Sequence, residues 1–363
     1  MIQDIAAALQ RQDFAEASRL LQTLPPDDPW SQLYQGQLHE HQQAWDLAED
    51  AYRSLLRSDS GPKISSEARQ GLQRLTRLRQ VQRQQQRDAA IAEAGQTELG
   101  VLILEPMPSE AKTQAAQALA KIMQLDPYSA RLLLPSHGWR LYRSGPMGEM
   151  QLYGQELRDA GIPVFWQSLQ QLKQIEVHQV FYFETDVDPV RVAISNPSQP
   201  HQPLPFHFSW SDVTQQVKGQ LPIFEEVVDL DPRGKLKRKE QIQDHAQFCD
   251  LHLQKRNCIL RFYDTGYQFN QGIKLTTSTT PKASADQNTS WAHWRRLMAF
   301  FDEYLPDIPT WSDFAPFAEA AVEQIDHLGK FESHINLLRR AESDWDQAFQ
   351  LYSGLAFLKF QHE

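Results

Sequence analysis

The sequence predicts an α+β protein of several domains, with helices at both ends and a mixed α/β body between them. Three observations predict this fold class. A helical motif recurs at an interval of 31 residues near the start, short apolar runs alternate with amphipathic stretches in the middle, and aromatic residues follow a helical spacing near the end. The chain has 363 residues, enough for two or three domains, and 41% of them are hydrophobic. Each domain therefore has enough apolar material for its own core without a metal or a disulfide.

A motif of one large residue, one small residue and a second large residue occurs twice near the start of the chain. The paired positions are Phe14 with Trp45, Ala17 with Ala48, and Leu21 with Tyr52. This spacing places large side chains against small ones between antiparallel helices. The motif resembles the tetratricopeptide repeat (TPR), with Gly36 at the family's glycine position, and the resemblance implies a groove that binds a peptide or a protein surface. An ordinary amphipathic helical hairpin is the alternative.

A long helix is expected over residues 64–94, at the end of a first domain that begins at the first residue. Its residues 69–87 include six arginines and no acidic residue. Arg79, Arg83 and Arg87 recur at every fourth position and therefore share one helix face. We predict that this face binds a partner, and a solvated charged face is the alternative.

Residues 95–175 are expected to form a small β-α-α-β-α-β domain. The predicted strands cover residues 99–104, 139–143 and 162–166, and the predicted helices cover residues 109–125, 128–134 and 147–160. Ser109 is expected to cap the first of these helices and Gly161 to end the third. The element order resembles the C-terminal domain of ribosomal protein L7/L12. That resemblance implies the fold alone, because the lysine-rich helix face of the ribosomal family is missing here.

Residues 176–274 are expected to form a mixed α+β domain. Strands are predicted over residues 177–183, 190–194, 206–210, 227–230 and 259–263, and a helix over residues 241–253. Residues 275–290 are rich in Thr, Ser and Ala and predict a flexible linker. Residues 291–363 predict a C-terminal helical segment, with helices over residues 291–304 and 313–328 and one or two more within 332–360.

Four residues in and beside the predicted helix 241–253 have side chains that bind zinc: His245, Cys249, His252 and Cys258. The first three are spaced at i, i+4 and i+7, which a helix stacks on one face, and two His with two Cys suit a tetrahedral ion. The alternative, which we favour, is a core stripe in which both cysteines are small buried hydrophobic residues. We therefore predict neither a metal nor a cofactor.

Acidic residues in the same region leave a metal-dependent hydrolase centred on residues 229–258 as an alternative function. The residues suited to acid–base chemistry or metal-assisted hydrolysis are Asp229, Asp231, Asp244 and His245. Residues 231–234 read Asp-Pro-Arg-Gly, however, which is typical of a β-turn. The chain also has no phosphate-binding loop, dinucleotide fingerprint, nucleophile elbow or HExxH motif. The sequence therefore favours a protein that is not an enzyme.

A second basic cluster interrupts a chain whose formal net charge is −10. Residues 233–239 carry five positive charges, on Arg233, Lys235, Lys237, Arg238 and Lys239. Such clusters attract phosphates and acidic protein surfaces. Neither basic cluster contains the interleaved aromatic residues of a single-strand binder. An acidic protein partner is therefore favoured, and nucleic-acid binding through residues 69–87 and 233–239 is the alternative.

The chain's two cysteines, Cys249 and Cys258, are too few for a disulfide framework and are typical of a reducing compartment. The start of the chain carries Asp4 and no basic segment, so no signal peptide is expected. No apolar run is long enough to span a bilayer. We expect a cytoplasmic protein whose membrane contact is at most peripheral.

Taken with the TPR-like motif, these features favour a non-enzymatic adaptor, scaffold or assembly factor that holds a protein partner with its helices and basic surfaces. Residues 139–166 and 229–250 resemble a cyanobacterial-type family of TPR-containing proteins. That resemblance implies a client in photosynthetic assembly at a membrane surface.

Overall fold

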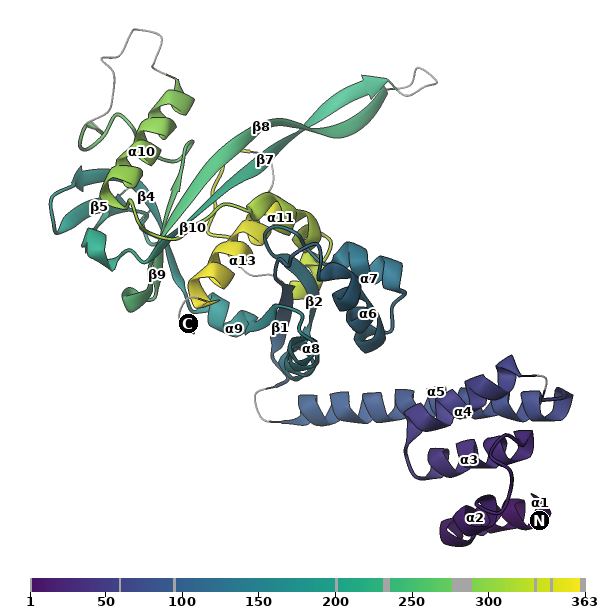
Figure 1. Cartoon of the computed structure of the whole chain (residues 1–363). Helices are drawn as coiled ribbons and strands as arrows, with labels where there is room; N and C mark the ends of the chain where they lie inside the picture. Colours follow the sequence, from purple (N-terminus) through teal and green to yellow (C-terminus); the bar gives the residue numbers. More distant parts are fainter. Residues whose placement is uncertain are drawn as a thin grey trace. The chain divides into compact units, whose positions relative to one another are not determined.

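The computed structural model describes residues 2–58, 60–93, 96–199, 202–230, 236–275, 289–329, 332–339 and 342–359, and only the backbone of residues 226–230 and 236–240. The chain divides into two compact units, Met1–Ala90 and Ile91–Glu363 (Figure 1). Each unit has hydrophobic cores of its own.

The described part of the first unit is built from helices. They are α1 (Ile2–Gln10), α2 (Phe14–Leu21), α3 (Pro29–His41), α4 (Trp45–Arg57) and the long α5 (Pro62–Ala92). Aspartates cap α2 and α3, because the side chains of Asp13 and Asp28 accept hydrogen bonds from the backbone N–H groups of Glu16 and Ser31.

The side chain of Tyr52 holds three helices of the first unit together. A Cβ atom at Gly36 of α3 would lie 2.8 Å from the Tyr52 ring, and one at Gly71 of α5 would lie 2.5 Å from it. The Tyr52 Oη atom donates a hydrogen bond of 2.8 Å to Glu40 Oε2, and Arg74 of α5 donates two more to the same carboxylate, at 2.9 and 3.0 Å. Burial raises the pKa of the Tyr52 phenol, which therefore stays a donor.

The second unit begins with a three-stranded antiparallel sheet in the order β2-β1-β3. Its elements are β1 (Leu99–Leu104), α6 (Lys112–Met123), α7 (Pro127–Leu133), β2 (Arg140–Pro146), α8 (Met147–Asp159) and β3 (Val164–Ser168), followed by the short α9 (Leu169–Lys173). Ser109 does not cap α6, which begins at Lys112 without a side-chain cap. Asp126 caps α7 through the backbone N–H of Ser129, and Gly161 follows α8 with a positive φ of 75°.

A larger sheet has the strand order β10-β7-β8-β9-β4-β5-β6 among the described residues. Its strands are β4 (Glu176–Thr185), β5 (Val190–Ile194), β6 (Leu204–Phe208), β7 (Gln215–Leu230), β8 (Leu236–Leu253), β9 (Cys258–Tyr263) and β10 (Thr310–Trp311), with 3-10 turns at Trp210–Asp212 and Gln254–Arg256. The β4–β9 and β10–β7 pairs are parallel, and the other pairs are antiparallel.

Helices from the end of the chain cover both faces of this larger sheet (Figure 1). One face packs against α10 (Ser290–Tyr304), and the opposite face packs against α11 (Phe314–Val322), α12 (Ile325–Leu328) and α13 (Asp344–Lys359). The core beneath α11 and α13 also contains Val101 and Phe165 of the smaller sheet. Residues from the predicted segments 95–175, 176–274 and 291–363 thus share one core. None of the described helices combines the length and the apolar composition needed to cross a bilayer.

Three predicted elements differ in the structure. The predicted helix 241–253 is wrong, because these residues belong to strand β8. The inner half of β8 is buried on both faces, because Phe248 belongs to one core and Cys249 to the other. Its sequence therefore lacks the alternation of apolar and polar residues that is typical of a strand with one exposed face. The predicted helix 313–328 is divided into α11 and α12. The predicted strand 206–210 ends at Phe208, and Trp210 begins a 3-10 turn. The helices predicted within residues 332–360 are represented by α13. Most of the predicted linker 275–290 lies outside the described residues.

The contact at Gly71 predicts an unusual response to alanine. Gly71→Ala favours the helix by about 1 kcal/mol through its intrinsic propensity. We nevertheless expect it to lower the free energy of unfolding by about 1–3 kcal/mol, because the new Cβ overlaps the Tyr52 ring. Urea unfolding followed by helical circular dichroism measures this change. The exposed α5 residue Ser66 provides the control, since Ser66→Ala should be neutral or slightly stabilising.

Candidate protein-binding surfaces

Strands β7 and β8 extend beyond the sheet as a two-stranded ribbon (Figure 1). They pair along their whole length, from Gln215 opposite His252 to Leu230 opposite Leu236. Strand β9 pairs with β8 only as far as Phe248, and β10 pairs with β7 only at Gln216 and Val217. Residues 220–230 and 236–247 therefore form a β-ribbon, which at about 3.3 Å per residue is about 36 Å long.

The inner end of the β-ribbon is packed, and the side chains of residues 241–245 farther out are exposed. Leu221 and Ala246 are fully buried, and a Cβ atom at Gly219 would lie 2.5 Å from the Phe349 ring of α13. Farther out, residues 241–245 are all exposed, and Ile242 has 47% of its surface accessible. An isolated two-stranded ribbon is marginally stable in water. The ribbon beyond β9 and β10 thus has two open strand edges and a half-exposed apolar residue, Ile242.

The described part of the second basic cluster, residues 236–239, lies at the outer end of the β-ribbon. By backbone register, Lys237, Arg238 and Lys239 of β8 are opposite Asp229, Val228 and Val227 of β7. Arg233 and Lys235, together with Asp231, lie outside the described residues. The basic residues of the described ribbon thus belong to β8, whose outer edge is open beyond β9.

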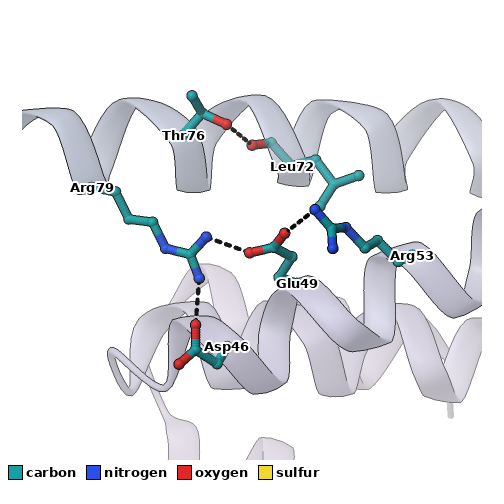
Figure 2. A network of polar contacts seen from close by, with 6 residues as sticks. All are labelled: Asp46, Glu49, Arg53, Leu72, Thr76 and Arg79. Carbon is teal, nitrogen blue, oxygen red and sulfur yellow. Dashed lines mark hydrogen bonds and ion pairs between the residues drawn. The ribbon is translucent and has the colours of Figure 1, made fainter. Parts of the chain in front are cut away.

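The arginine face of α5 is engaged within its own unit at Arg79. Its Nη2 atom lies 2.7 Å from Asp46 Oδ1, and its other terminal nitrogen donates to Glu49 (Figure 2). Glu49 also pairs with Arg53 at 2.5 Å, and on α5 the Thr76 hydroxyl donates to the Leu72 carbonyl at 2.9 Å. Arg79 therefore links α4 to α5, instead of presenting a free guanidinium to a partner.

Farther along α5 the helix is less covered by its own unit. The buried residues of α5 are Ile64, Ala68, Gly71 and Leu75, all in its first half. In the second half Arg83 and Arg87 are half-buried and make contacts of their own, whereas Arg77, Leu78 and Val81 are exposed. The exposed basic position on this half of α5 is thus Arg77, which lies off the face predicted from the sequence.

The four candidate zinc ligands are not brought together. His245 is exposed on the β-ribbon, whereas Cys249 and Cys258 are buried in the core beneath α10. His252 points to the opposite side of β8, where it bonds to Ser353 of α13. Burial raises the pKa of the Cys258 thiol to about 11 and also raises that of Cys249, so both thiols stay protonated. No group of three ligating side chains is placed for a metal anywhere in the described ranges.

The acidic residues proposed for hydrolysis are also separated. Asp244 is opposite Ile223, six positions before Asp229 on β7 and hence about 20 Å from it along the strand. The Asp244 carboxylate accepts a hydrogen bond from the backbone N–H of His245. These residues lie along an exposed ribbon, so the described geometry does not assemble the predicted hydrolytic site.

A buried polar network near His252 was not predicted from the sequence. Arg261 of β9 and Asp250 of β8 are both fully buried, and two hydrogen bonds of 2.9 and 2.7 Å join them. Ser353 of α13 donates to Asp250 at 2.6 Å, and its oxygen lies 3.0 Å from His252 Nε2. The sequence could have indicated this network only through the opposite charges of Asp250 and Arg261. To use that indication one must know that the two residues face each other on adjacent strands.

The network continues from His252 toward β10. Gln215 Nε2 lies 2.9 Å from His252 Nδ1 and donates to the Ala356 carbonyl, while Trp311 donates to Gln215 Oε1 at 2.7 Å. Burial lowers the pKa of His252 to about 3. Although Ser, His and Asp side chains meet here, all three are inaccessible to solvent. The arrangement therefore holds α13 on the sheet and offers no route for a substrate.

Comparisons of the chain with protein-family models, characterised proteins and solved structures find no match. The function must therefore be inferred from the β-ribbon, the second half of α5 and the charges that they carry.

The buried ion pair predicts a large effect of a small substitution. Asp250→Asn leaves the Arg261 charge buried without its counter-charge, and we expect the free energy of unfolding to fall by about 3–5 kcal/mol. The matched control is Asp302→Asn, which removes the exposed carboxylate 3.5 Å from Lys218 and should cost less than about 1 kcal/mol. Urea unfolding of both variants tests the difference, and equal losses would contradict it.

The depressed pKa of His252 predicts acid sensitivity. Its pKa is about 3 in the folded protein and about 6.5 in the unfolded chain, so the unfolded state binds the proton more tightly. The stability that neutral His252 contributes is complete above pH 6.5 and is lost as the pH falls from 6.5 toward 3, by about 2 kcal/mol at pH 5. His252→Gln should unfold more easily at neutral pH but lose less stability on acidification. If the free energy of unfolding falls equally with pH in both proteins, His252 is not the cause of the acid sensitivity.

Proposed function

We propose that the chain is a non-enzymatic protein-binding adaptor or assembly factor whose main contact is the β-ribbon. The observation that supports this is the uncovered outer part of the ribbon, with its open strand edges and exposed Ile242. Open edges and exposed apolar residues favour aggregation unless a partner covers them. Among the described side chains only the inner end of the ribbon, at Leu221 and Ala246, belongs to a core. The length of the ribbon beyond that end is best explained as a binding element.

The charges of the ribbon favour an acidic partner segment at the β8 edge. The basic residues Lys237, Arg238 and Lys239 belong to β8, whereas the facing end of β7 carries Glu225, Glu226 and Asp229. A partner strand added beside β8 would form main-chain hydrogen bonds with its open edge. Acidic side chains on that strand would complement the basic run and repel wrong partners.

The helical unit supplies a second surface in this proposal. In this proposal helices α1–α4 form TPR-like pairs that bind a protein surface. The second half of α5 adds Arg77 and the exposed Leu78 and Val81 to that surface. Because Arg79 links α4 to α5, its role in the proposal is structural. A cytoplasmic location is part of the proposal, and two free, buried cysteines agree with a reducing compartment.

A tagged pull-down from native extract tests this function, with and without nuclease. The test variant is Lys237→Glu/Arg238→Glu/Lys239→Glu. The matched control is Lys121→Glu/Lys173→Glu/Lys255→Glu, which changes the net charge equally at exposed positions in the same unit. We expect a protein that the native chain and the control recover despite nuclease, and that the ribbon variant loses by at least about tenfold.

Two other outcomes would decide against this function. Recovery that disappears with nuclease would instead support nucleic-acid binding, and steep weakening with salt would accompany it. Equal recovery by the ribbon variant and the control would remove the β-ribbon as the contact.

A further inference from the structure

The face of the larger sheet that packs against α11 and α13 contains a cavity over β4. Its volume is about 900 Å³, a size typical of small-ligand sites. Val177, Gln179 and Phe181 alternate along β4 and line one side, and residues 332–336, which belong to no helix or strand, line the other. The cavity forms beside the described residues 332–336, which follow α12 in the chain and are not helical.

The cavity wall formed by residues 332–336 is held by two hydrogen bonds from β9. Arg261 Nη1 donates to the Ser333 carbonyl at 2.6 Å, and Tyr263 Oη donates to the Asn336 carbonyl at 3.0 Å. Between these anchors His334 has a φ of 53°, in the left-handed region that residues with a side chain rarely adopt. The anchors hold the backbone in this conformation, so the cavity is formed before any ligand binds.

The described lining of the cavity has a negative charge. Glu332 and Glu342 contribute carboxylates, and no lysine or arginine side chain lines it among the described residues. His334 Nδ1 lies 3.6 Å from Glu332 Oε1, and burial lowers the pKa of this imidazole, so it adds no positive charge at neutral pH. Phe181, which is half-buried, adds aromatic surface to the same cavity, whereas Tyr263 is almost fully buried behind the lining.

We propose that this cavity binds an organic cation, namely a primary ammonium or guanidinium group on an aliphatic stem. The carboxylates of Glu332 and Glu342 would balance its charge, and the neutral lining amides and hydroxyls would accept its remaining N–H donors. The stem would pack on the half-buried Val177 and Phe181, and the Phe181 ring would also attract a nearby cation. All of these residues lie outside the β-ribbon, so the inference is independent of the proposed function.

Titration calorimetry on the full chain tests this site with two probes. Spermidine represents a free polyamine, and the blocked tripeptide acetyl-Gly-Arg-Gly-amide represents a basic protein side chain; acetyl-Gly-Gln-Gly-amide is the uncharged comparison. We expect at least one cationic probe to bind and the glutamine peptide not to bind. The probe that binds more tightly identifies the source of the cation.

The variant Glu332→Gln/Glu342→Gln should weaken binding by at least about tenfold, because each exposed carboxylate contributes a charge-assisted contact. The matched control is Glu319→Gln/Glu323→Gln, which removes the same charge from exposed positions at α11 and should bind as the native chain does. Gln347→Trp, which leaves the charge unchanged and fills part of the cavity, should also block binding.

The proposal is overturned if neither cationic probe binds to the native chain. It is also overturned if the control loses as much affinity as the cavity variant, because binding would then depend on net charge alone. Binding that Gln347→Trp leaves unchanged would place the cation elsewhere on the protein.

Discussion

The ion pair between Asp250 and Arg261 is the interaction on which the larger unit depends. Both side chains are completely buried, and taking each charge out of water costs several kcal/mol. The pair is stable because its remaining hydrogen-bonding positions are also used. Ser353 donates to Asp250 from 103 residues away, and the Ser333 carbonyl accepts from Arg261 at a separation of 72 residues. The pair therefore fixes where α13 and the backbone at Ser333 lie on the sheet.

Tyr52 imposes a comparable constraint on the helical unit by steric means. Its ring occupies the space that side chains at Gly36 and Gly71 would fill, and its hydroxyl shares the Glu40 carboxylate with Arg74. The close approach of the three helices and the hydrogen bonding of the Glu40 carboxylate therefore both depend on Tyr52. The same residue types that suggested a repeat in the sequence, a large side chain beside a small one, perform this packing.

Local signals in the sequence identified elements whose residues interact over short separations. Helix α10 and strand β9 were predicted nearly to the residue, because each has a regular apolar pattern. Strand β8 was missed because its inner half is buried on both faces, which removes the alternation of a strand. The engagement of Arg79 was missed because its partners, Asp46 and Glu49, are 33 and 30 residues away. The Asp-Pro-Arg-Gly sequence, which is typical of a turn, falls in the chain between strands β7 and β8, and these strands pair. Local sequence patterns were therefore sufficient to predict the β-ribbon.

The two candidate binding elements differ in how much order they have before binding. The cavity wall is anchored by Arg261 and Tyr263, so a ligand there has little backbone to immobilise. The outer β-ribbon has only its own cross-strand pairing, so a partner must supply order as well as contact. Binding at the ribbon therefore loses part of its interaction energy to ordering and depends on a large contact area and complementary charge. This difference suits the ribbon to a macromolecular partner and the cavity to a small cation.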